Sequence, residues 1–295
     1  MKKIISYLIF ILVSSFTFAQ TDGIRKEISK IIKGKRATIG VALYDVQTGK
    51  TLNINGDKHF PMQSVFKFPI ALKVLAEVDK GKMNLKDSIF ITAKDLLPRT
   101  WSPIRDNYPE GNIKMPLSEI VRYTISQSDN NGCDILLHLL GGTSEVNNYL
   151  SSLGITEMKI KKTEAEQHLT PSAQFDNWTT PTCAIQLLKL FQEKKILSTD
   201  SRNFLWKTMT ETSTGSVKSQ IPQDVIVAHK TGSAFFPGSN VVNDIGVMQM
   251  PDNRTILYAI FIMNSKESKE ANYQVIADIA KVVCQYSASY LKRKQ

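Results

Sequence analysis

The segments with β-strand character lie at the two ends of this chain, and helical periodicity fills the stretch between them. β-Rich runs occur at residues 38–44 and 51–54, and again at 225–229, 241–250 and 255–263. A sheet assembled from both ends must fold back around the middle of the chain. The pattern therefore predicts an α/β (α+β) protein with a five-stranded antiparallel sheet and a separate all-α lobe.

Helical patterns occur both next to these strands and between them. Residues 23–33 and 271–291 predict N- and C-terminal helices that flank the sheet. The middle of the chain predicts further helices at 65–78, 118–126, 131–140, 144–153 and 182–191. We assign residues 20–60 and 206–295 to the sheet lobe and 61–205 to the all-α lobe, and we expect the ligand in the cleft between them.

The N-terminus has the features of a secretory signal. Lys2 and Lys3 form a short basic region, an apolar run follows over residues 4–18, and small residues end at Ala19. The run is shorter than the roughly 20 residues that span a bilayer. We predict a signal peptide at residues 1–19, cleavage near Ala19 and no stable membrane anchor.

The charge and the histidine and cysteine content exclude several classes of function. The formal charge is +10, but the basic residues are spread along the chain and accompany no nucleic-acid recognition motif, so we expect no nucleic-acid partner. The four histidines lack the spacing of metal ligands, so we expect no metal and no cofactor; they are His59, His138, His168 and His229. We expect Cys133, Cys183 and Cys284 to be buried thiols.

The first group of residues with catalytic character is Ser64 and Lys67. Three residues apart on a helix, they share a face, and a neighbouring amine can accept the proton of a serine nucleophile. Free backbone N–H groups at the start of that helix could stabilise an oxyanion. Taken alone, the pair also fits a capping serine followed by a solvated lysine.

Two further groups complete the pattern. Ser128-Asp129-Asn130 lies at the junction of two predicted helices, where a hydroxyl can pass a proton to a leaving amine and an amide can bind substrate. Lys230-Thr231-Gly232-Ser233 ends a predicted strand, where an ammonium group and two hydroxyls can hold a carboxylate. Gly232 lets a ligand approach the strand backbone closely.

In this order, and on helix, loop and strand, the three groups resemble the signature of class A serine β-lactamases and penicillin-binding proteins. The resemblance extends over essentially the whole chain after the signal. It implies that Ser64 is the nucleophile, that Lys67 and Ser128 carry protons, and that Asn130, Lys230, Thr231 and Ser233 bind substrate. It also implies an oxyanion hole made by the backbone N–H groups of Ser64 and Ser233.

A glutamate separates the lactamases from the penicillin-binding proteins. In class A a Glu on a loop that closes with Thr-Pro activates the water that releases the acyl group. Counting back from Thr180-Pro181 by the family spacing places this role on Glu164 and leaves Glu166 as a solvated neighbour.

Several positions depart from the common class A pattern. His168 stands where the family usually has Asn, and Lys162 and Asn177 replace an Arg-Asp ion pair at the base of the loop. In both respects, and over residues 60–64, the chain is most similar to the VEB/PER-type extended-spectrum enzymes. This implies an extended-spectrum cephalosporinase with a repositioned loop, in which His168 borders the substrate.

The edges of the cleft have their own implied roles. Trp101 matches an aromatic residue at the entrance of the family's cleft, and Lys218 is a candidate to hold the substrate carboxylate. Gln63 and Ala234 occupy the positions where serine carbapenemases carry a disulfide, so we do not expect a strong carbapenemase.

Together these features predict an enzyme of the bacterial periplasm that hydrolyses small-molecule β-lactam antibiotics and confers resistance to them. We expect it to act as a monomer. A D,D-peptidase of the penicillin-binding-protein type and a non-hydrolytic β-lactam sensor are the alternatives. Neither gives a role to Glu164, and the intact Lys67 and Asn130 argue against the sensor.

Overall fold

The computed structural model describes residues 22–167, 169–193 and 196–292. The predicted signal peptide and His168 lie outside the described residues. Among the residues that it describes, no helix is both long enough and apolar enough to cross a membrane.

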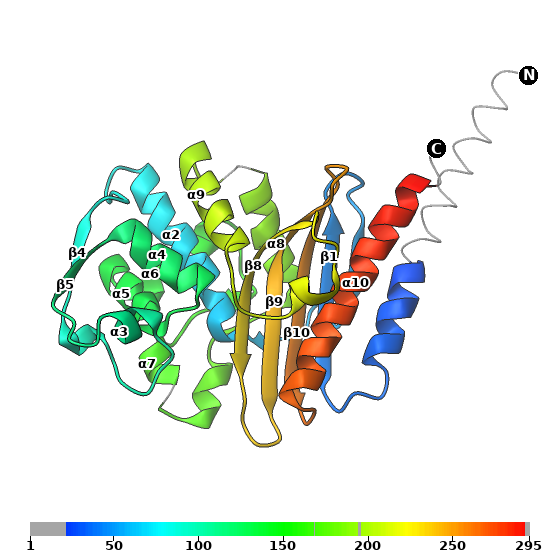
Figure 1. Ribbon diagram of the computed structural model, residues 1–295, viewed down its shortest axis with the longest axis horizontal. Helices are drawn as coiled ribbons and strands as arrows, with labels where there is room; N and C mark the ends of the chain where they lie inside the picture. The colour runs from blue at the N-terminus through cyan, green and yellow to red at the C-terminus, as the bar shows by residue number, and fades with distance from the viewer. Residues whose placement is uncertain (1–21, 168, 194–195, 293–295) are drawn as a thin grey trace, which may run out of the picture.

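The main sheet has the five antiparallel strands predicted from the two ends of the chain (Figure 1). The order across it is β2 (Thr51–Ile54), β1 (Thr38–Asp45), β10 (Thr255–Ser265), β9 (Asn240–Gln249) and β8 (Ile226–Ala234). Each neighbouring pair is antiparallel. N-terminal β1 pairs with C-terminal β10, so neither end of the chain completes the sheet alone.

Both faces of this sheet are buried, which explains why its strands are almost continuously apolar. In β10, Leu257, Ala259 and Phe261 belong to one hydrophobic cluster, whereas Tyr258, Ile260 and Ile262 belong to another. The first cluster continues into the helical part of the molecule. The second lies beneath the terminal helices.

Helices cover the sheet on both sides (Figure 1). Residues 22–32 and α10 (Lys269–Lys292) cover one face, as predicted, and α8 (Pro181–Gln192) packs on β10 and β1 from the other. The helical part contains α2 (Lys67–Asp79), α3 (Pro103–Asn107), α4 (Leu117–Ser126), α5 (Asn130–Leu140), α6 (Thr143–Ser152), α7 (Glu164–Gln167) and α9 (Thr199–Thr210). Four short 3-10 helices are η1 (Gln63–Phe66), η2 (Ala93–Asp95), η3 (Pro171–Phe175) and η4 (Val217–Gln220).

The helical part also contains two small sheets that sequence periodicity did not predict. They are β3 (Phe60–Pro61), β7 (Trp178–Thr179) and β6 (Met158–Lys159), and the pair β4 (Ser88–Ile91) and β5 (Ile113–Pro116). Strands of two to four residues are too short to show an alternating pattern. The β3–β7 pair is extended by a hydrogen bond from Met62 N to Asn177 O (2.8 Å), so it fixes the chain just before Ser64. The lobe boundaries at 61 and 205 stay a prediction.

The packing of β10 against β3 predicts that alanine substitutions of two phenylalanines lower the free energy of unfolding by very different amounts. Phe261 is fully buried and its ring centroid lies 5.7 Å from that of Phe60, whereas Phe90 is 55% exposed. We expect Phe261→Ala to lower the free energy of unfolding by about 3–5 kcal/mol, through lost burial and a residual cavity. Phe90→Ala should change it by no more than about 0.5 kcal/mol. Denaturant unfolding of both variants checks this, and similar losses would contradict the packing described.

Candidate active site

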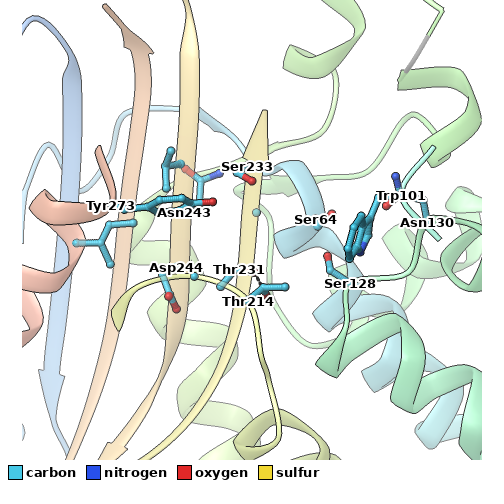
Figure 2. Close-up of a pocket in the computed structure, with 14 residues that line it drawn as sticks. Ser64, Trp101, Ser128, Asn130, Thr214, Thr231, Ser233, Asn243, Asp244 and Tyr273 are labelled. Carbon is cyan, nitrogen blue, oxygen red and sulfur yellow. Dashed lines mark hydrogen bonds between the residues drawn. The ribbon is translucent and has the colours of Figure 1, made fainter. Parts of the chain in front are cut away.

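A cleft of about 210 Å³ lies between the edge strand β8 and the helical part of the molecule (Figure 2). Residues from η1, from the turn before α5, from β8 and β9, and from α10 line it. They are Ser64, Trp101, Ser128, Asn130, Thr214, Gly215, Thr231, Gly232, Ser233, Val242, Asn243, Asp244, Tyr273 and Ile276. The cleft thus unites most of the residues that the sequence singled out.

Ser64 and Lys67 meet because the chain forms a 3-10 turn at this point. Ser64 lies in η1, and Lys67 is the first residue of α2. Residues three apart are eclipsed in a 3-10 helix, so the two side chains lie above one another. Lys67 Nζ donates a hydrogen bond to Ser64 Oγ over 2.9 Å.

The Lys67 ammonium is fully buried and is surrounded by oxygen atoms. It donates to Ser128 O (2.8 Å) and Asn130 Oδ1 (2.5 Å), and it forms an ion pair with Glu164 Oε1 (2.9 Å). A buried charge is tolerated only when it is paired and hydrogen-bonded. The contacts of Lys67 therefore hold three segments of the chain together: its own, the Ser128–Asn130 turn and the loop that carries Glu164.

Glu164, and not its neighbour Glu166, reaches the nucleophile. Ser64 Oγ donates to Glu164 Oε1 over 3.3 Å. Glu166 Oε2 instead accepts from the backbone N–H of Thr163 (2.9 Å). In this arrangement the Ser64 hydroxyl accepts from the lysine and donates to the glutamate.

Asp134, which the sequence did not single out, holds Glu164 in place. Its two carboxylate oxygens accept from the backbone N–H groups of Glu164 (2.7 Å) and Ala165 (2.9 Å). Burial raises the pKa of Asp134 from 3.8 to about 6, although the two hydrogen bonds act against this.

Ser128 lies between the two buried lysines of the site. Its hydroxyl accepts from Lys230 Nζ (2.9 Å) and, at the limit of hydrogen bonding, from Lys67 Nζ (3.5 Å). The backbone of Ser128 has a φ of 60°, an uncommon conformation for a residue other than glycine. The turn thus aims the hydroxyl at both ammonium groups.

The two residues after Ser128 fix this turn. Asp129 caps α5 by accepting from Gly132 N (2.8 Å), and it also accepts from Ser102 Oγ (3.0 Å). Asn130 donates through Nδ2 to Thr100 Oγ1 (2.6 Å). Its amide is therefore oriented with the oxygen toward Lys67.

Strand β8 approaches the nucleophile because Gly232 has no side chain. A Cβ atom at this position would lie 2.5 Å from Met62 O and 2.9 Å from Ser64 N.

Lys230, two residues before Gly232, is fully buried, and burial together with the charge of Lys67 lowers its pKa well below the usual value.

The hydroxyls of β8 line the other half of the cleft (Figure 2). Thr231 Oγ1 lies 2.5 Å from Thr214 Oγ1, and Ser233 is exposed to solvent. Trp101 stands at the opposite rim, 59% exposed, with its Nε1 donating to Gln127 O (2.8 Å).

Lys218 does not take the place suggested for it, whereas Asn177 replaces the ion pair of the loop as expected. Lys218 does not line the cleft; its ammonium donates to Thr210 O (2.8 Å) and Thr212 O (3.2 Å). Asn177 replaces an ion pair at the base of the loop with neutral hydrogen bonds. Its Oδ1 accepts from Lys162 N (2.9 Å), and its Nδ2 donates to Lys162 O (2.7 Å).

Asn243, which also lies outside the predicted set, supports the turn before Ser64. Its Nδ2 donates to Pro61 O (2.8 Å) and Met62 O (3.0 Å) from the next strand, β9. Nothing in its local sequence indicates this role, nor that of Asp134, because each acts on a segment far away in the chain. Thr100, Thr214 and Tyr273 were missed for the same reason.

The described residues contain no group of three His, Cys, Asp or Glu side chains that could hold a metal ion. Cys133, Cys183 and Cys284 are buried free thiols, as predicted.

Comparison with known proteins finds similarity to β-lactamases over nearly the whole chain. Residues 23–287 match the model of the β-lactamase enzyme family. The chain is 43% identical to β-lactamase VEB-1 of Pseudomonas aeruginosa, covering 96% of this chain and 98% of the relative. It is 37% identical to the extended-spectrum β-lactamase PER-1 of Pseudomonas aeruginosa, covering 97% and 94%.

Comparison with solved structures also finds β-lactamases. The TLA-1 extended-spectrum β-lactamase superposes with a TM-score of 0.88 at 42% identity, covering 90% of this chain and 98% of that one. A β-lactamase from Chitinophaga pinensis also superposes with a TM-score of 0.88 at 42% identity, covering 90% and 99%.

The raised pKa of Asp134 predicts how stability depends on pH. The folded protein binds this proton more tightly than the unfolded chain does, so stability falls as pH rises from about 4 to about 6. Asp134→Asn does not titrate. Relative to that variant, the parent should lose about 2–3 kcal/mol of unfolding free energy over this range. Denaturant unfolding at pH 4 and pH 7 measures the difference, and a value independent of pH would contradict the assignment.

Proposed function

The chain belongs to the class A branch of the β-lactamase enzyme family, and we propose that it hydrolyses β-lactams through an acyl-enzyme on Ser64. The observation that carries the proposal is the pair of contacts at Ser64 Oγ. Lys67 Nζ lies 2.9 Å and Glu164 Oε1 lies 3.3 Å from this atom.

In acylation, Ser64 Oγ attacks the carbonyl carbon of the lactam. Because the Lys67 ammonium donates to this oxygen and Glu164 accepts from it, the serine proton passes to the carboxylate side. The close approach at Gly232 supports an oxyanion hole formed by the N–H groups of Ser64 and Ser233.

Opening of the ring leaves a nitrogen that must be protonated. Ser128 is suited to donate this proton because its hydroxyl is held between Lys67 and Lys230. The hydroxyl takes a replacement proton from Lys67 or Lys230, and the proton that Glu164 received from Ser64 returns through Lys67 to the ammonium group that gave it, so Glu164 is a carboxylate again before deacylation.

Deacylation requires a water that attacks the ester on Ser64. Glu164 is the proposed general base, since its carboxylate is already within 3.3 Å of Ser64 Oγ and is fixed through Asp134. This step separates a hydrolase from the two alternatives, the D,D-peptidase and the β-lactam sensor, which would retain the acyl group.

The substrate is a small-molecule β-lactam whose carboxylate faces Lys230, Thr231 and Ser233. Asn130 would bind the side-chain amide, and Trp101 would border the entrance of the cleft with His168. The PER-1 and TLA-1 enzymes are named extended-spectrum β-lactamases, which supports an extended-spectrum cephalosporinase. The neutral Asn177 hydrogen bonds replace a charged clamp in the loop that carries Glu164, consistent with a repositioned loop.

The cellular setting follows from the N-terminal segment. Lys2, Lys3 and the apolar run that ends at Ala19 support export to the bacterial periplasm. There the enzyme would hydrolyse antibiotics before they reach the cell-wall machinery.

Replacing Glu164 tests the mechanism. We expect the parent to hydrolyse a chromogenic cephalosporin over many turnovers per active site. Glu164→Gln should lower kcat at least 100-fold and accumulate a covalent adduct on Ser64, because deacylation loses its general base whereas Lys67, freed from its ion pair, can still take the serine proton in acylation. Steady-state kinetics and intact-protein mass spectrometry measure the two effects.

Glu166→Gln is the matched control, two residues away on the same short helix. It should keep kcat within about threefold of the parent, because Glu166 only accepts from Thr163 N. If Glu164→Gln turns over like the parent, the proposed general base is wrong. An adduct that already persists in the parent would favour the peptidase or the sensor.

A further inference from the structure

A buried polar cluster lies behind strand β8, on the side away from Ser64. It consists of His229, Asp244 and Tyr258, on the neighbouring strands β8, β9 and β10, and none is more than 1% exposed. His229 Nδ1 lies 3.0 Å from Asp244 Oδ1, and the Tyr258 hydroxyl donates to the same oxygen over 2.9 Å. The mechanism above uses none of these three residues.

The strand register explains how the cluster forms. His229 and Tyr258 both pair with Gly246, and Asp244 lies two residues away on the same face of β9. A Cβ atom on Gly246 would lie 2.8 Å from that of His229. The glycine therefore leaves room for both side chains to converge on the carboxylate.

The hydrogen bonds make Asp244 an acceptor from both neighbours. Burial raises the pKa of Tyr258 well above its usual value, and the charge of Asp244 adds to this, so the phenol remains a donor. The other ring nitrogen of His229, Nε2, is buried without a hydrogen-bond partner. A proton on Nε2 would be a buried donor with no acceptor among the described residues, so the geometry favours the tautomer whose N–H is on Nδ1 and points to Asp244.

Asp244 is also adjacent to the second buried lysine of the active site. It pairs across the sheet with Thr231, the residue after Lys230. Figure 2 shows Asp244 on the far side of β8 from Ser64 and Ser128, at the other end of the cleft. Its charge therefore acts on Lys230 through the strand.

The two buried lysines differ in how their charge is balanced. Lys67 has a carboxylate oxygen, that of Glu164, at 2.9 Å. Lys230 donates only to the neutral oxygens of Ser128 and Thr231, and no carboxylate among the described residues forms an ion pair with it. Of the carboxylates that favour its protonated form, Glu164 has the larger effect and Asp244 follows, and Asp244 is the one that takes no part in the proposed reaction.

We propose that Asp244, fixed by His229 and Tyr258, is a positioning residue that keeps Lys230 protonated from behind β8. This inference rests on the proposed function, in which the Lys230 ammonium binds the substrate carboxylate and contacts Ser128. The role of Asp244 is electrostatic, since a neutral Lys230 would neither attract the substrate carboxylate nor supply a proton to the Ser128 hydroxyl.

Other titratable groups around Asp244 define the controls. They are His229 and Lys230 on β8, Tyr258 on β10, Lys218 on η4, and Tyr273 and Cys284 on α10. Burial lowers the pKa of Lys218, and the charge of Asp244 opposes that change. Lys218 is therefore near enough to Asp244 for its ammonium to offset part of the carboxylate's charge.

The test is the pH profile of kcat/KM for a chromogenic cephalosporin. Asp244→Asn removes the charge at nearly constant shape, so it should disfavour protonated Lys230 and move the basic limb to lower pH by about one unit. Asp244→Glu keeps the charge and should leave the limb within about 0.3 units of the parent. A structural role alone would lower melting temperature and activity without moving the limb.

Two further variants make the result specific. In a Lys230→Arg background the guanidinium stays charged, so Asp244→Asn should no longer move the limb. Lys218→Gln removes the opposing cation and should move the limb upward by a few tenths of a unit; it serves as the test if Asp244→Asn does not fold. The proposal is overturned if the basic limb does not move in Asp244→Asn, or in Lys218→Gln when Asp244→Asn does not fold. It is also overturned if Asp244→Asn still moves the limb in the Lys230→Arg background. A parent without cephalosporin turnover would instead overturn the proposed function.

Discussion

The burial of the Lys67 ammonium is the constraint on which the rest of the site depends. A desolvated charge costs several kcal/mol unless nearby oxygens replace its water. Here they come from the η1 turn, from the Ser128–Asn130 turn and from the loop that carries Glu164. Loss of any one leaves a buried charge partly unpaired, so the positions of Ser64, Ser128 and Glu164, the proposed nucleophile, proton donor and general base, are coupled.

The side chains that hold the site in place are of two kinds, neutral and negatively charged, and the two kinds lie in different places. The neutral side chains hold the backbone. Asn243 donates to the carbonyls of Pro61 and Met62, just before the η1 turn. Asn177 binds the backbone of Lys162 at the base of the loop that carries Glu164. Carboxylates are placed next to the reacting groups. Asp134 fixes Glu164, and Asp244 lies behind Lys230, so the buried lysines act within a field of buried anions.

Much of this organisation was predictable from local patterns. The strand runs at both ends gave the five-stranded antiparallel sheet, because a strand buried on both faces is conspicuously apolar. The short spacing of Ser64 and Lys67, and the glycine that follows Thr231, indicated groups that meet within one turn or at one strand edge. The short strands β3, β6 and β7 were not predictable, since two residues carry no periodicity.

The sequence by itself thus determined the main sheet, most of the longer helices and the candidate residues for the chemistry, but it did not predict α3, α7 or α9. The family spacing had favoured Glu164 over Glu166, but only the tertiary structure decided which carboxylate contacts which cation. Glu164 and Glu166 are both carboxylates of one four-residue helix, yet the first reaches Lys67 and the second turns back to Thr163. Asp134 and Asp244 have no local signal at all. The reason is physical: electrostatic and hydrogen-bonding partners are set by distance in space, and around this site those partners lie as many as 182 residues apart in the chain.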